Sequence, residues 1–114
     1  LNIYISDFGG KTDLCYVAEV SKKIVGAAWT RIINDYGHID DETPSLSISL
    51  LKEFRNQGIG TTMVKQILKK LKEQGYKQVS LSVQKKNYAF NMYKNVGFEI
   101  VRENKEDYIM VCRL

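Results

Sequence analysis

One eight-residue stretch decides the fold: Arg55-Asn56-Gln57-Gly58-Ile59-Gly60-Thr61-Thr62. The preceding Ser45–Leu51 alternates serine with leucine or isoleucine, which is the period of a strand that buries one face. After the stretch, apolar residues recur at helical spacing up to Gly75, with lysines on the opposite side; they are Met63, Val64, Ile67, Leu68 and Leu71. These patterns predict a strand, a tight turn and a helix of about four turns.

The two glycines give this turn the character of an anion site. Glycine lets the backbone turn tightly and brings bare amide groups close to a ligand, and the first N–H groups of a helix favour negative charge. The stretch has neither the GxxxxGK pattern of a Walker loop nor the third glycine of a dinucleotide fingerprint. The alternative is a purely structural turn, with Thr61 or Thr62 at an early helix position.

The rest of the chain predicts two hairpins, one further strand and one further helix. In chain order these are a hairpin of Leu14–Val20 with Ile24–Ile33, a strand at Lys77–Val83, a helix at Asn87–Val96 that Gly97 ends, and a hairpin of Glu99–Arg102 with Tyr108–Leu114. This order indicates an α+β or mixed α/β sheet in which the strands on either side of the long helix are parallel. Residues 1–12 show no clear pattern, and we expect a loop or frayed segment there.

Length and composition restrict the class of protein. The 114 residues, 44% hydrophobic and 26% charged, are typical of one globular domain, which we expect to span residues 1–114. No apolar run approaches the ~20 residues of a membrane span, and Leu1–Asp7 lacks the pattern of a secretory signal. Cys15 and Cys112 form no metal-binding motif. We therefore expect a cytoplasmic protein with reduced cysteines, no metal and no membrane partner.

Charge is distributed unevenly along a chain whose net charge is +4. Lys52–Lys86 holds nine basic residues against two acidic ones, whereas Asn34–Glu42 holds four acidic residues and neither lysine nor arginine. The first segment suits an anion and the second a cation. A nucleic-acid-binding domain is a distant alternative, because the basic residues lack an aromatic stacking pattern.

Two ordered motifs make the chain resemble the GCN5-related N-acetyltransferase (GNAT) superfamily. The Arg/Gln-x-x-Gly-x-Gly/Ala motif of that family is matched by Arg55, Gly58 and Gly60. Its later Asn-x-x-Ala-x-x-x-Tyr-x-x-x-Gly-Phe pattern is matched closely, with the small residue shifted slightly at Ala89 and Phe90; the matching residues are Asn87, Tyr93, Gly97 and Phe98. The resemblance covers roughly residues 14–114. It implies a mixed, mostly antiparallel, splayed sheet flanked by helices, with the family's N-terminal helices apparently missing.

The resemblance also implies acetyl-CoA as co-substrate. Backbone amides of the glycine turn would hold its pyrophosphate, flanked by Arg55 and Asn56; they belong to Gln57, Gly58, Ile59, Gly60 and Thr61. Main-chain groups of Leu50 and Leu51 would pair with the pantetheine arm. The side-chain amide of Asn87 would bond this arm, although asparagine there is equally explained as a helix N-cap.

By the same resemblance, Tyr93 would be the general acid in a direct attack of a primary amine on the thioester within a ternary complex. A phenol near the departing thiolate can protonate it. Tyrosine at this helical spacing is otherwise a plain core residue, and Tyr88 is the neighbour most easily mistaken for it.

The general base stays open among Glu42, Asp41 and His38, which otherwise only solvate a loop. If the acidic loop faces the cleft, it would attract a cationic amine, such as a polyamine, an aminoglycoside, a lysine or a protein N-terminus. Because few residues precede Leu14, we expect the acceptor pocket to be incomplete, or to be completed by a second copy of the chain or by residues outside this sequence. The alternative is a non-catalytic acyl-CoA-binding or protein-interaction module with a degenerate GNAT fold.

Overall fold

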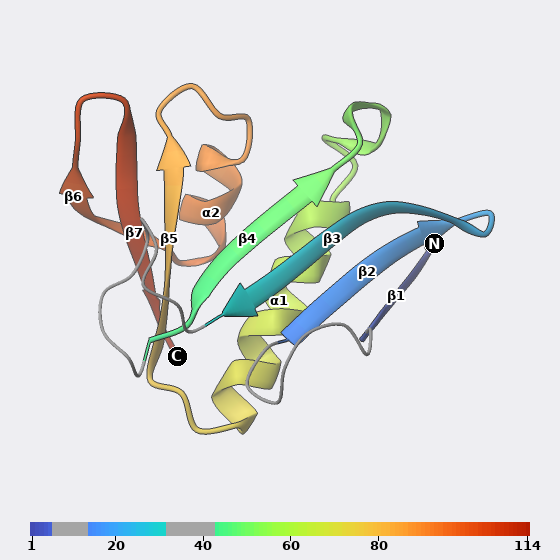
Figure 1. Ribbon diagram of the computed structural model, residues 1–114, viewed down its shortest axis with the longest axis horizontal. Coiled ribbons are helices and arrows are strands. Elements are labelled where there is room, and N and C mark those ends of the chain that lie inside the picture. The colour runs from blue at the N-terminus through green and yellow to red at the C-terminus, as the bar shows by residue number, and fades with distance from the viewer. Residues whose placement is uncertain (6–13, 32–42) are drawn as a thin grey trace.

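The computed structural model describes residues 1–5, 14–31 and 43–114. These residues form seven strands, two α-helices and one turn of 3₁₀ helix (Figure 1). In chain order they are β1 (Asn2–Ile5), β2 (Leu14–Val20), β3 (Lys23–Arg31), β4 (Ser45–Leu50), the 3₁₀ turn (Lys52–Phe54), α1 (Ile59–Glu73), β5 (Gln78–Gln84), α2 (Phe90–Val96), β6 (Glu99–Glu103) and β7 (Asp107–Arg113).

The strands form one sheet with the order β1-β2-β3-β4-β5-β7-β6. Among the described strands only β4 and β5 run parallel. They share a single register pair, Ser45 with Ser80, where Ser80 N donates to Pro44 O at 3.0 Å. Beyond this point the two strands diverge (Figure 1). The expected mixed, mostly antiparallel, splayed sheet is therefore confirmed.

The expectation of a loop or frayed segment at the N-terminus is wrong for its first residues. β1 pairs antiparallel with β2, with Asn2 opposite Glu19 and Ile5 opposite Tyr16. Tyr4 Oη also donates to Glu19 Oε2 at 2.9 Å. Four residues are too few to show a strand period, and the pairing comes from β2 rather than from local preference.

Both helices cover the same face of the sheet (Figure 1). Met63, Val64, Ile67 and Leu71 of α1 are fully buried against it, as the helical spacing predicts. α2 packs beside α1, and the ring of Phe90 stacks on Tyr108 of β7 at 5.0 Å. The core therefore lies between the helices and one sheet face.

Two glycines end the helices, as the sequence indicates. Gly75 and Gly97 have φ of 92° and 117°. After α2, Gly97 N donates to Lys94 O at 3.1 Å and Phe98 N to Tyr93 O at 3.0 Å. This pattern is a Schellman motif, which requires a left-handed residue that glycine adopts without a Cβ clash.

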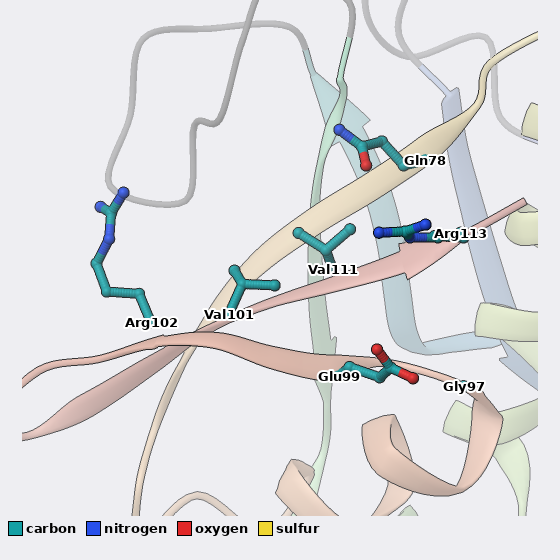
Figure 2. Close-up of a pocket in the computed structure, with 7 residues that line it drawn as sticks. All are labelled: Gln78, Gly97, Glu99, Val101, Arg102, Val111 and Arg113. Atoms are coloured by element: carbon teal, nitrogen blue, oxygen red, sulfur yellow. The ribbon is translucent and has the colours of Figure 1, made fainter.

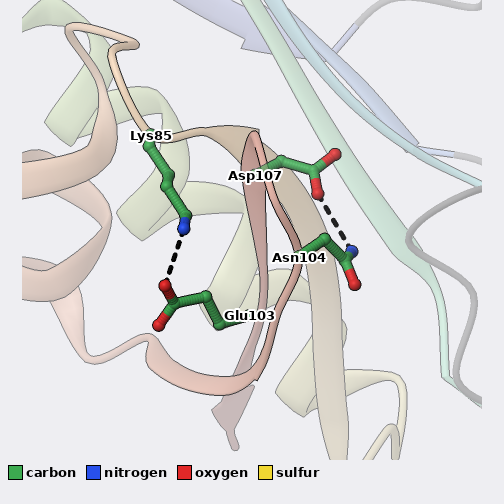
Figure 3. A network of polar contacts seen from close by, with 4 residues as sticks. All are labelled: Lys85, Glu103, Asn104 and Asp107. Atoms are coloured by element: carbon green, nitrogen blue, oxygen red, sulfur yellow. Dashed lines mark hydrogen bonds and ion pairs between the residues drawn. The ribbon is translucent and has the colours of Figure 1, made fainter.

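Polar contacts tie the β6–β7 hairpin to the segment that leads into α2 (Figure 3). Lys85 Nζ lies 2.6 Å from Glu103 Oε2, and Lys85 N donates to Glu106 O at 2.9 Å. Within the hairpin turn, Asn104 Nδ2 donates to Asp107 Oδ1 at 2.9 Å. The side-chain hydrogen bond to Glu103 is also the main cause that raises the pKa of Lys85. These contacts hold the approach to α2 against the hairpin.

Candidate functional site

The glycine turn presents backbone amides that the helix itself does not use. Gly58 caps α1 in the left-handed conformation with φ of 82°, and no side chain caps the helix. The first bond of the helix runs from Thr62 N to Gly58 O, at 3.0 Å. The amides of Ile59, Gly60 and Thr61 come before it and have no partner within the helix. Asn56 also has a positive φ, 62°, which makes the turn tight. The result is a row of amide donors at the positive end of the helix dipole.

Leu50 and Leu51, which are predicted to hold the pantetheine arm, differ in the direction of their main-chain groups. Leu51 N donates to Val25 O on β3, and Leu51 O accepts from Phe54 N, both at 2.9 Å. Successive residues of a strand present their main-chain groups to opposite sides, so those of Leu50 point away from β3, into the splay. Leu50 is thus placed for the predicted pairing, although its O already accepts one bond, from Arg55 Nε, whereas both main-chain groups of Leu51 have partners.

Arg55 connects the end of β4 with the start of the α2 segment. Its Nε donates to Leu50 O at 3.1 Å, and its guanidinium carbon lies 4.0 Å from the ring centroid of Tyr88. The sequence alone indicated no role for Tyr88 and marked it only as a neighbour of Tyr93. No local pattern signals this contact, since it joins two loops that are distant in sequence.

Tyr93 is the buried residue of α2 and lies in the core. Its side chain is only 5% exposed, and its ring meets Phe98 edge to face at 5.6 Å. Burial raises the pKa of the Tyr93 phenol well above its ordinary value, and the nearby Tyr88 adds to the rise. The phenol therefore stays protonated at neutral pH. Its burial matches the core alternative, and the raised pKa makes the phenol a weaker acid than an exposed tyrosine.

Asn87 caps the turn that precedes α2 and not α2 itself, whose N-cap is Ala89 without a side-chain bond. Its Oδ1 accepts from Ala89 N at 2.8 Å, and α2 begins three residues later than predicted, at Phe90. This bond uses only the oxygen, so the amide nitrogen stays available for the predicted contact. Gln57 Nε2 donates to Glu53 O at 2.9 Å, which leaves the backbone amide as its candidate ligand group.

The candidate bases Glu42, Asp41 and His38 lie outside the described residues. The first described residue after them, Thr43, is buried, and its Oγ1 accepts from Gln78 Nε2 at 2.9 Å. The described chain therefore places the N-terminal end of β4 firmly against β5.

A hollow of about 430 Å³ lies away from the glycine turn, near the start of β5 (Figure 2). Its lining comes from β5, β6, β7 and the end of α2: Gln78, Gly97, Glu99, Val101, Arg102, Val111 and Arg113. One carboxylate and two guanidinium groups share it, so its charge favours no single class of ligand. The residue patterns of the sequence did not indicate this hollow.

Comparison with known proteins decides the family. Residues 2–98 match the acetyltransferase (GNAT) family. The chain belongs to this family. The matched range includes the glycine turn, Asn87, Tyr93 and Phe98, so the predicted resemblance is confirmed.

Individual relatives agree with the family. An N-alpha-acetyltransferase of Sulfurisphaera tokodaii is 32% identical, over 87% of this chain and 68% of its own. A PaiA N-acetyltransferase of Thermoplasma acidophilum, solved with coenzyme A, has a TM-score of 0.76 at 23% identity, over 90% of this chain and 61% of its own. The ribosomal-protein-S18-alanine N-acetyltransferase of Escherichia coli has a TM-score of 0.75 at 21% identity, over 92% of this chain and 71% of its own. The chain thus spans roughly two thirds of these GNAT proteins.

Two kinds of feature are absent from the described residues. Neither helix in residues 1–5, 14–31 and 43–114 has the length and apolar character of a membrane span. The same ranges contain no group of three or more His, Cys, Asp or Glu residues with metal-binding geometry.

Proposed function

We propose that this GNAT chain transfers the acetyl group of acetyl-CoA to a primary amine by direct attack in a ternary complex. The observation that carries the proposal is the row of unused amides at the glycine turn, next to the splay between β4 and β5. A polyanion needs several donors and a positive field, and this end of α1 supplies both.

The cofactor contacts follow from this placement. The amides of Gln57, Gly58, Ile59, Gly60 and Thr61 bind the pyrophosphate, with Arg55 and Asn56 beside them. Leu50 pairs with the pantetheine arm through its main chain, and Leu51 continues the wall of the cleft. The Asn87 amide nitrogen donates to the same arm while its oxygen caps the following turn.

Tyr93 supplies the proton that the reaction requires. The neutral amine nitrogen attacks the thioester carbonyl carbon and a tetrahedral oxyanion forms. The nitrogen gives up a proton to a base or to water, and the carbonyl re-forms as the carbon–sulfur bond breaks. The departing thiolate, whose conjugate thiol has a pKa of about 8.5, takes the proton of the Tyr93 phenol. Burial keeps the phenol protonated but also makes it a weaker acid, so the transfer requires the departing sulfur to lie within hydrogen-bond reach of the Tyr93 hydroxyl.

An α-amine is the acceptor that we favour. Deprotonation at pH 7 costs roughly 1 kcal/mol for an α-amine with a pKa near 8, but about 4 kcal/mol for a lysine-like amine near 10. The names of the Sulfurisphaera and Escherichia relatives also specify α-amino acceptors. Glu42, Asp41 and His38 remain the three candidate bases, and small-molecule amines or lysine are the other acceptors to test.

The proposal also includes the cellular compartment and the oligomeric state. The two cysteines are free and buried, and burial raises the pKa of each thiol, which suits a reducing cytoplasm. We further propose that residues 1–114 act as one domain without a metal, and that a homodimer completes the acceptor wall. Sedimentation with and without acetyl-CoA tests the dimer.

Titration calorimetry tests the cleft. We expect acetyl-CoA and CoA to bind with a higher affinity than ADP, since ADP lacks the pantetheine arm. Gly60→Glu should abolish binding because it places bulk and negative charge in the glycine turn, where a Cβ would meet Ile48 Cδ1 at 3.4 Å and Met92 Cε at 3.5 Å. Circular dichroism checks that the variant is folded. Gly75→Glu makes the same change at the other end of α1, where a Cβ meets no atom within 4 Å but the φ of 92° strains any other residue. A Gly75→Glu variant that circular dichroism shows to be folded should keep its binding.

The results separate the proposal from its rivals. Binding that survives Gly60→Glu would contradict the assignment of the turn. Binding without turnover on any amine would favour the non-catalytic acyl-CoA-binding module. Salt-sensitive binding to duplex DNA in place of acetyl-CoA would favour the nucleic-acid alternative.

A further inference from the structure

Two contacts hold the Arg55 side chain in place in the absence of a ligand. Its Nε bonds Leu50 O on β4, and the face of its guanidinium rests on the Tyr88 ring, 4.0 Å from the centroid. Tyr88 follows β5, so the contact bridges the open side of the splay. A free arginine gives up rotamer freedom when it binds a ligand, and an arginine that is already held gives up less.

The bond to Leu50 O uses Nε, so the two terminal nitrogens of the guanidinium are the donors that Arg55 can offer to a ligand. Among the described residues, no ion pair joins Arg55 to a carboxylate. The backbone of Arg55 lies three residues before Gly58, so its side chain starts from the same turn as the amide row. Guanidinium N–H groups bind phosphate oxygens more strongly than neutral donors do.

Tyr88 keeps part of its surface in solvent, with the residue 43% exposed. The ring of Tyr88 lies against the Arg55 guanidinium. A cation over an aromatic face is attracted by the ring quadrupole.

From these observations we infer that Tyr88 is a positioning residue for the phosphate end of acetyl-CoA, because it holds the Arg55 guanidinium beside the glycine turn. The inference rests on the proposed function. Leu50 O keeps a second lone pair, so its bond to Arg55 and a bond to the pantetheine arm are compatible. Tyr88 therefore contributes to phosphate affinity through Arg55 and leaves the recognition of pantetheine unchanged.

A double-mutant cycle tests the inference by calorimetry with CoA and with pantetheine, which lacks every phosphate. We expect Tyr88→Ala to weaken CoA binding by about two- to fivefold and Arg55→Ala by about tenfold or more. In the double variant the loss should equal that of Arg55→Ala alone, because Tyr88 acts through Arg55. Tyr88→Phe keeps the ring face and should bind like the wild type.

Controls make the outcomes distinct. Tyr4→Ala removes a tyrosine that is 42% exposed on β1, matched to Tyr88 in exposure, and should not change CoA affinity. Equal losses for CoA and pantetheine in Tyr88→Ala, or additive losses in the cycle, would overturn the inference while leaving the cofactor cleft in place. A wild-type chain that does not bind CoA would instead refute the proposed function, and the inference with it.

Discussion

Tyr93 combines burial, an edge-to-face partner and a raised pKa in one side chain. Replacement with phenylalanine keeps the ring and its contact with Phe98 but removes the proton. We expect Tyr93→Phe to lower kcat by about 100-fold or more while the Kd for CoA stays unchanged. Steady-state kinetics on the best acceptor, with calorimetry in parallel, measure both. Tyr108→Phe is the control, and an unaltered kcat in Tyr93→Phe would assign the acid to another group.

The same raised pKa predicts a loss of stability at high pH. Above the ordinary tyrosine value of 10.0, the unfolded chain loses the Tyr93 proton while the folded chain retains it. The stability that this group contributes is therefore complete below pH 10 and falls as the pH rises towards the folded pKa, by about 1.4 kcal/mol per pH unit. Urea unfolding at pH 9 and above should show a steeper loss in the wild type than in Tyr93→Phe. Parallel curves would mean that the phenol is not desolvated.

The end of α2 depends on the left-handed conformation of Gly97. Any other L-residue with φ near 117° is strained, although the space around this Cβ is ordinary, with Cys112 Sγ at 3.5 Å. We expect Gly97→Ala to lower the free energy of unfolding by about 1–2 kcal/mol, measured by urea denaturation. Gly97→Asn should cost less, since asparagine tolerates this region better. Equal stability of all three proteins would contradict the capping role.

β3 and β4 approach closely at Gly26, near the site. A Cβ added there would lie 2.6 Å from Leu50 Cδ1, 3.0 Å from Ser49 O and 3.3 Å from Met63 Cε. We expect Gly26→Ala to reduce stability by about 1–3 kcal/mol, because the Ser49 backbone cannot yield as a side chain can. The shift of Leu50 should also weaken acetyl-CoA binding in calorimetry. An unchanged unfolding midpoint would show that Leu50 repacks without cost.

At the scale of the whole molecule, the cofactor should stabilise the fold that forms its site. The glycine turn, the end of β4 and the α2 segment come together only in the folded chain, so acetyl-CoA binds the native state alone. At a ligand concentration of 100 times Kd, the free energy of unfolding should rise by about 2.7 kcal/mol. Thermal unfolding with and without acetyl-CoA measures this rise. Gly60→Glu should show none, and an equal rise in that variant would place the ligand elsewhere.

Most elements could be predicted because their patterns are local. Alternation marked β4 and β5, helical spacing marked α1, and the glycines at 75 and 97 marked where both helices end. β1 could not be predicted, since its four residues become a strand only when β2 offers its edge. The start of α2 was placed early because Asn87 caps a turn that precedes the helix.

Residue order alone was enough for the GNAT resemblance, the amide-rich turn and the position of Tyr93, because each depends on spacing within a short segment. The tertiary structure alone decided that Leu50, and not Leu51, turns its main chain into the splay, that Arg55 rests on Tyr88, and that the Tyr93 pKa is raised. Strand register, ring stacking and desolvation arise between segments that are far apart in the chain. No local pattern can encode them, because the partner that creates each one is brought into contact only by folding.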